Sequence, residues 1–177
     1  MLKVHGGRML NESRLTELLH AMAGGDGHAA GELYGLIGGR LHGQAQRILR
    51  DPGLAEDAVQ EAFLKIWRNA FRYDEAKGAA SAWMSVIARR VALDRRPPIA
   101  ALTLPELEAP SVDPDYVHPR LRESLAELPD LHRKALVLMY VYGLSHSELA
   151  AAMNAPLGTV KSWVRRASAA LKEKLER

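Results

Sequence analysis

Apolar residues recur every three or four positions along most of this chain, which is the spacing of one face of an α-helix. Before residue 97, four such stripes predict four helices. Gly24-Gly25 ends the first stripe, and Asp51-Pro52-Gly53 ends the second. The stripes consist of Leu15, Leu18, Leu19 and Met22; Leu33, Leu36, Ile37, Leu41, Ile48 and Leu49; Val59, Ala62, Phe63, Ile66, Trp67 and Ala70; and Trp83, Val86, Ile87 and Val91.

The second half of the chain predicts four shorter helices. Ser145 and Glu148 have the spacing of a capping box, and Pro156 suits the first turn of a final helix. No alternating pattern is long enough to predict a strand, so the expected fold class is all-α. The apolar stripes are Leu121, Leu125 and Leu128; Leu131, Ala135, Leu138, Met139 and Tyr142; a helix from Ser145 through Met153; and Val160, Trp163, Val164, Ala167 and Leu171.

A proline-rich stretch separates the two halves. Proline removes a backbone donor and disfavours helix in the residue before it, so this stretch predicts an extended linker. We therefore expect a domain at 1–96, an acidic linker at 97–116 and a second domain at 117–177. Six of the nine prolines lie here: Pro97, Pro98, Pro105, Pro110, Pro114 and Pro119.

Charge is distributed unevenly between these parts. Residues 1–96 hold 14 basic and 11 acidic side chains, giving +3, and residues 129–177 hold 8 basic and 4 acidic ones, giving +4. Residues 97–116 hold four acids and no Lys or Arg, giving −4. Two basic blocks flanking an acidic connector favour a polyanionic partner, although charge alone is weak evidence.

The composition excludes several classes of protein. The chain has no cysteine, so it can form neither disulfides nor thiolate metal sites, and a reducing cytosol fits. No segment resembles a membrane span or a signal peptide. The seven histidines are scattered without metal-ligand spacing, and no phosphate loop or nucleophile elbow is present. We therefore expect no enzyme activity, no metal and no cofactor.

The C-terminal segment has the spacing of a helix-turn-helix. Ala150, Asn154 and Val160 stand where this motif needs a small residue, a left-handed turn and a buried aliphatic residue. If Val160 faces the core, a polar set faces outward and can contact phosphates and base edges; a solvated basic face is the alternative. The outward set is Thr159, Lys161, Ser162, Arg165 and Arg166.

The N-terminal half offers two further candidate surfaces. Glu56, Asp57, Gln60 and Glu61 are expected on the helix face opposite Phe63, Ile66 and Trp67, either as a solvated helix start or as a docking surface for a basic partner. Residues 71–81 then place aromatic and charged side chains on a loop, and an arginine-rich helix follows. Rings beside arginines suit single-stranded nucleic acid, unless Phe71 and Trp83 belong to the core.

Two long segments resemble the bacterial extracytoplasmic-function (ECF, group IV) sigma factors. The run LAEDAVQEAFLKIWRNAFRYDEAKGAASAWMSVIARRVALDRR is similar to their second conserved region. The run LPDLHRKALVLMYVYGLSHSELAAAMNAPLGTVKSWVRRASAALKEKL is similar to their fourth, and GLSHSELA…PLGTVKSWVRR resembles the sigma-K-like subgroup in particular. Two linked motifs in the correct order are stronger evidence than either one alone.

The resemblance implies three sets of site residues. One set would grip the β′ clamp of RNA polymerase, a second would engage the −10 element as its strands separate, and a third would contact the −35 duplex. Many relatives have Asn where Arg90 stands. The sets are Asp57, Gln60, Glu61, Phe63, Leu64 and Trp67; Lys65, Tyr73, Arg89 and Arg90; and Thr159, Lys161, Ser162, Arg165 and Arg166.

The implied partners are the polymerase core through its β′ clamp and β subunits, promoter DNA, and a cognate anti-sigma factor, with no small-molecule substrate. The implied location is the cytoplasm, where a membrane-anchored anti-sigma factor could hold the chain at the inner membrane face. The alternative is a stand-alone helix-turn-helix regulator with an N-terminal helical sensor domain. The regulator would bind specific DNA without polymerase, whereas the sigma factor would need it.

Overall fold

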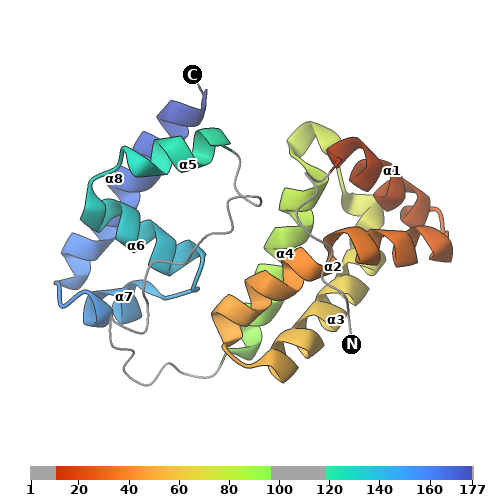
Figure 1. The fold of residues 1–177 in the computed structure, drawn as a ribbon, viewed down its shortest axis with the longest axis horizontal. Helices are drawn as coiled ribbons and strands as arrows, with labels where there is room; N and C mark the ends of the chain where they lie inside the picture. The colour runs from red at the N-terminus through yellow and green to blue at the C-terminus, as the bar shows by residue number, and fades with distance from the viewer. Residues whose placement is uncertain (1–10, 97–118, 177) are drawn as a thin grey trace. The chain divides into compact units, whose positions relative to one another are not determined.

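The computed structural model describes residues 11–96 and 119–176 (Figure 1). The chain divides into two compact units between Pro97 and Pro98. Every secondary-structure element of the described residues is helical, which confirms the all-α prediction. The expected acidic linker at 97–116 lies outside the described residues, and so do residues 1–10.

The first unit contains the four expected α-helices and two short 3-10 turns. Helices α2, α3 and α4 pack against one another, and α1 lies against α2 with further contacts to α4 and η1 (Figure 1). One apolar core joins all four helices. The elements are α1 (Glu12–Ala23), α2 (Gly27–Leu49), α3 (Pro52–Asn69), η1 (Ala70–Arg72), η2 (Glu75–Lys77) and α4 (Ala80–Arg95).

Helix α3 begins earlier than its apolar stripe indicates. The segment Asp51-Pro52-Gly53 was expected only to stop the preceding helix, but it also starts the next one. Arg50 ends α2 in the left-handed conformation, with φ of 59°. The Asp51 side chain then accepts a hydrogen bond from the Leu54 backbone N–H at 2.8 Å, and Pro52 takes the first helical position, where no N–H is needed. The two helices are therefore joined by a very short turn.

The second unit contains the other four expected helices around a separate core. The capping box is confirmed, because Ser145 N donates to the Glu148 carboxylate at 2.7 Å and Glu148 N donates to the Ser145 hydroxyl at 3.3 Å. The second core consists mainly of leucine, valine and alanine. The helices are α5 (Pro119–Ala126), α6 (Asp130–Tyr140), α7 (His146–Ala152) and α8 (Leu157–Glu176).

The turn between α7 and α8 has the geometry expected of a helix-turn-helix. Asn154 adopts a left-handed conformation with φ of 46°, as predicted from its place in the motif. Val160 is completely buried. Pro156 lies just before α8 rather than inside its first turn, and its carbonyl accepts the hydrogen bond from Val160 N at 3.1 Å. The turn therefore fixes the register in which α8 buries one face and exposes the other.

Replacing Val160 with aspartate tests whether the two units fold separately. The charge would be buried in the second core without a partner, so we expect Val160→Asp to unfold residues 119–176 and to leave residues 12–96 folded. Amide hydrogen exchange followed by mass spectrometry checks this, because protection should be lost only in α5 to α8. Loss of protection in α2 or α3 would contradict it.

Candidate functional site

The exposed face of α3 carries most of the residues expected to bind polymerase. Asp57, Gln60, Leu64 and Trp67 are three or four positions apart, so they share one side of the helix. Leu64 is 54% exposed and Trp67 is 42% exposed, although both are large apolar side chains. Trp67 was expected opposite the acids, and this was wrong. The surface made by these four residues is called the α3 face below.

Phe63 is the member of the expected polymerase-binding set that lies inside the protein. It is only 9% exposed and belongs to the first core. Its ring meets the Tyr34 ring edge-on, with 5.0 Å between the centroids. Phe63 therefore packs in the core beneath the α3 face and is not part of the exposed surface.

Glu61 connects the α3 face to the cations beside it. Its carboxylate is 2.7 Å from Lys65 Nζ and 2.7 Å from Arg95 Nη2. Asp57 lies at the edge of the same network, 4.0 Å from Arg95 Nη1. The hydrogen bonds from Lys65 and then from Arg95 lower the pKa of Glu61, so this side chain is ionised at neutral pH.

A pocket of about 320 Å³ lies between α3 and α4, and we call it the α3–α4 pocket. Three of its lining residues are cationic and none is acidic. Trp83 contributes a half-buried ring to its wall. A pocket that combines positive charge with an aromatic ring can hold a phosphate and a nucleobase together. The lining residues are Lys65, Asn69, Arg72, Trp83, Ile87, Arg90 and Val91.

Two of the four residues expected at the −10 element, Lys65 and Arg90, meet in this pocket. Arg89 does not line it. The sequence interpretation did not single out four of the lining residues as site candidates, namely Asn69, Arg72, Ile87 and Val91. Helical spacing contains part of the missing signal, because Lys65 and Asn69 are four positions apart on α3, and Ile87 and Arg90 are three apart on α4.

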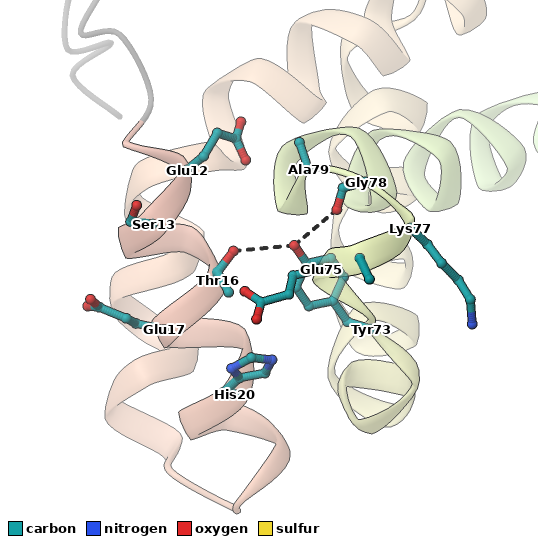
Figure 2. Close-up of a pocket in the computed structure, with 11 residues that line it drawn as sticks. Glu12, Ser13, Thr16, Glu17, His20, Tyr73, Glu75, Lys77, Gly78 and Ala79 are labelled. Atoms are coloured by element: carbon teal, nitrogen blue, oxygen red, sulfur yellow. Dashed lines mark hydrogen bonds between the residues drawn. The ribbon is translucent and has the colours of Figure 1, made fainter.

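Tyr73, the remaining −10 candidate, is 8% exposed and lies in the core. Figure 2 shows its hydroxyl between α1 and the loop before α4. The hydroxyl donates to the Gly78 carbonyl at 3.1 Å and lies 3.3 Å from the Thr16 hydroxyl. Its ring centroid is 5.6 Å from that of Trp83. Tyr73 is therefore used inside the protein and does not line the α3–α4 pocket.

The residues around Tyr73 differ from it in exposure. Phe71, for which a core position was one of two readings, is 69% exposed, and the Arg72 guanidinium lies 5.4 Å from its ring centroid. Trp83 is half-buried and packs against the first core, as the alternative reading held. In this loop Tyr73 is therefore buried and Phe71 is exposed to solvent.

Helix α8 presents the outward face that its sequence predicts. Val160, Val164 and Ala167 are buried, and Trp163 is half-buried against the second core. Four of the five candidates for duplex DNA are exposed and the fifth is half-buried. The exposed ones are Thr159, Lys161, Arg165 and Arg166, and the half-buried one is Ser162.

Family models match both units of this chain. The sigma-70 region 2 family model matches residues 33–96, and the sigma-70 region 4 model matches residues 118–171. An ECF RNA polymerase sigma factor called SigK from Mycobacterium tuberculosis is 37% identical, over 93% of this chain and 95% of that protein. This chain belongs to the ECF sigma factors.

Two further relatives extend the comparison. A SigK protein of Mycobacterium sp. (strain KMS) is 34% identical over 85% of both chains. The solved structure of CnrH in complex with the cytosolic domain of CnrY has 23% identity and a TM-score of 0.45, covering 92% of this chain and 97% of that one.

Within residues 11–96 and 119–176, no helix is long and apolar enough to cross a membrane. In the same ranges, no group of three or more His, Asp or Glu side chains could hold a metal ion.

Neutralising Glu61 should release cations for nucleic acid. In Glu61→Gln, Lys65 and Arg95 lose the carboxylate with which they are paired. We therefore expect the variant, in the absence of polymerase, to bind a short single-stranded oligonucleotide about threefold more tightly than the wild type at low salt. The gain should shrink as salt rises. Fluorescence anisotropy measures both effects.

The matched control is Glu56→Gln, which changes the net charge equally at an exposed position of the same helix. An equal gain in both variants would mean that net charge, and not the release of Lys65 and Arg95, is responsible.

Proposed function

We propose that this ECF sigma factor docks on the RNA polymerase core through the α3 face, engages the separated −10 strand at the α3–α4 pocket and contacts the −35 duplex through α8. One observation carries the proposal for the first unit. The α3 face and the cationic pocket lie on adjacent sides of one helix, and Glu61 is paired with Lys65, which lines that pocket. Docking and strand capture would therefore be set by the orientation of α3.

The composition of the α3 face supports protein docking. Interfaces concentrate binding free energy in a few large side chains, with tryptophan prominent among them, surrounded by a polar rim. Trp67 and Leu64 would supply this apolar centre, and Asp57 and Gln60 would supply the rim. The carboxylate of Asp57 would favour a basic surface on the polymerase clamp.

The α3–α4 pocket supports strand capture by its charge and its ring. Removing a base from a duplex costs a few kcal/mol in lost stacking and pairing, and a protein can offset this only by offering the base new contacts. Lys65, Arg72 and Arg90 would neutralise backbone phosphates, and Trp83 would give an unstacked base an aromatic neighbour. The site works by binding, so we propose no catalytic role for this chain.

Control by a cognate anti-sigma factor in the cytoplasm is part of the same proposal. Away from polymerase, Leu64 and Trp67 leave apolar surface in contact with water. Contiguous exposed apolar surface favours association with a protein partner. An anti-sigma factor that covers the α3 face would block polymerase directly.

Transcription in vitro tests the function as a whole. Core polymerase is incubated with and without the full chain on a library of promoters, and the start sites are sequenced. We expect defined start sites only when the chain is present, and little promoter binding by the chain alone. Specific DNA binding by the chain without polymerase, and no effect on polymerase, would instead support the stand-alone regulator.

Truncating the α3 face should weaken polymerase binding without unfolding the protein. Asp57 and Leu64 are both exposed, so the double variant Asp57→Ala, Leu64→Ala removes no core packing. We expect its affinity for core polymerase to fall about tenfold, since losing an apolar anchor typically costs over 1 kcal/mol and losing a rim charge adds a smaller penalty. Competition with labelled wild-type chain measures this.

The control for that experiment is Leu36→Ala, which removes an exposed leucine from α2 instead of α3. Full competition by the double variant would show that the docking surface lies elsewhere.

Removing one cation from α8 should weaken only the duplex contact. Arg166 is exposed on the outward face of α8, so Arg166→Ala should reduce −35 binding and lower the salt slope by about one phosphate contact, with polymerase affinity unchanged. Titration of a −35 duplex at several salt concentrations, with the holoenzyme, checks both quantities. The exposed Lys172→Ala, further along the same helix, is the control for a general charge effect.

A further inference from the structure

Helix α1 lies before the part of the chain that the region 2 family model matches, and the function proposed above gives it no role. It nevertheless makes two polar connections to the segment between α3 and α4. One runs from Glu12 to the first turn of α4, and the other runs from Thr16 to the loop of residues 71–79, which we call the α4 loop. Both connections lie beside an open pocket of about 680 Å³ between α1 and this loop (Figure 2).

The first connection supplies a cap that α4 lacks from its own sequence. The residue at its N-cap, Ala79, has no side chain that can accept a hydrogen bond. The Glu12 carboxylate accepts instead, from Ser81 N at 3.2 Å and from the Ser81 hydroxyl. A carboxylate at a helix N-terminus satisfies an open backbone donor and interacts favourably with the helix dipole. Glu12 therefore holds the first turn of α4 against the first turn of α1.

The second connection depends on the tyrosine hydroxyl. Tyr73 is bonded to the Gly78 carbonyl, across its own loop, and lies within hydrogen-bond distance of Thr16 on α1. Figure 2 shows this chain of contacts running from α1 through Tyr73 to Gly78. Apart from Tyr73, every residue of the α4 loop is exposed, so burial does little to fix its conformation. The Tyr73 hydroxyl joins the loop both to itself and to α1, and the Tyr73 ring adds a contact with His20 of α1, with the centroids 6.0 Å apart.

These two connections end next to residues that line the α3–α4 pocket. Arg72 immediately precedes Tyr73, and Trp83 comes two positions after Ser81. The Tyr73 and Trp83 rings are also in contact, with centroids 5.6 Å apart. The wall of the pocket formed by Arg72 and Trp83 is thus set by bonds that start on α1.

We propose that Glu12 and Thr16 are positioning residues, which act through Ser81 and Tyr73 to hold the α4 loop and Trp83 in the conformation that determines base preference at the −10 element. The inference rests on the proposed function of the α3–α4 pocket. A positioning role differs from a purely structural role of α1 in one measurable way. Removing either connection changes which −10 base is preferred, in addition to lowering the stability of the protein.

The test uses full-length variants assembled with core polymerase and a promoter library randomised in the −10 element. Tyr73→Phe removes the hydroxyl and keeps the ring, and Glu12→Ala removes the cap of α4. Losing one hydrogen bond changes a conformational equilibrium by about fivefold, so we expect the relative use of −10 sequences to change by about that factor in each variant. Preferences in a library randomised at −35 should be unchanged.

Two matched controls accompany these variants. Glu17→Ala removes an acid that lines the same open pocket but is paired with Arg14 on its own helix. Thr16→Ser keeps the hydroxyl, whereas Thr16→Val removes it at nearly the same volume. The −10 profiles of Glu17→Ala and Thr16→Ser should match that of the wild type, and that of Thr16→Val should shift in the same direction as that of Tyr73→Phe.

The outcomes separate this inference from the proposed function. If Tyr73→Phe, Glu12→Ala and Thr16→Val reduce transcription from all −10 sequences by the same factor, in step with lower melting temperatures, α1 is only structural and the inference is overturned. If Arg90→Ala also leaves transcription from every −10 sequence at the wild-type level, the pocket does not engage the −10 element, and the proposed function fails together with the inference.

Discussion

The close packing of one side of α3 is the constraint on which both candidate surfaces of the first unit depend. Ala55, Ala58 and Ala62 are buried on this side, and their small size lets α2 and α4 approach the helix closely. Ile66 completes the buried stripe. Because rotation of α3 about its axis would expose this stripe, the helix has one stable orientation. That orientation places Trp67 outward and directs Lys65 toward α4.

The same orientation makes the two surfaces electrically dependent on each other. Glu61 stands between the α3 face and the α3–α4 pocket and is paired with a cation on either side, Lys65 on its own helix and Arg95 on α4. A basic surface that approaches the α3 face competes with these cations for the same carboxylate. Each cation that is displaced becomes available to a phosphate. In the proposed function, polymerase binding and strand capture would be linked through this side chain, at distances where exposed charges still interact in physiological salt.

The sequence predicted the helices well because each helix has its own periodic signal, and it predicted the turn at Asn154 because few residues accept a left-handed conformation. It placed Trp67 on the wrong side, because an apolar residue at the edge of a stripe looks the same whether it packs inward or awaits a partner. The burial of Tyr73 could not be predicted, since the ring packs in the first core and the hydroxyl meets that of Thr16, 57 positions earlier in the chain. The α3–α4 pocket could not be predicted, because its shape depends on the angle at which the two helices pack, and local sequence patterns do not specify that angle.

The side chains that line the α3–α4 pocket limit which hydrogen bonds a bound base could form there. The Arg90 guanidinium only donates hydrogen bonds, whereas an asparagine amide can both donate and accept them. Among the seven side chains that line the pocket, Asn69 alone has an acceptor oxygen. Its Nδ2 donates to the Lys65 carbonyl at 2.8 Å, which fixes the plane of the amide. In the proposed function, Asn69 is therefore the side chain of this pocket that could accept a hydrogen bond from a base edge, whereas Arg90 would add charge for a phosphate.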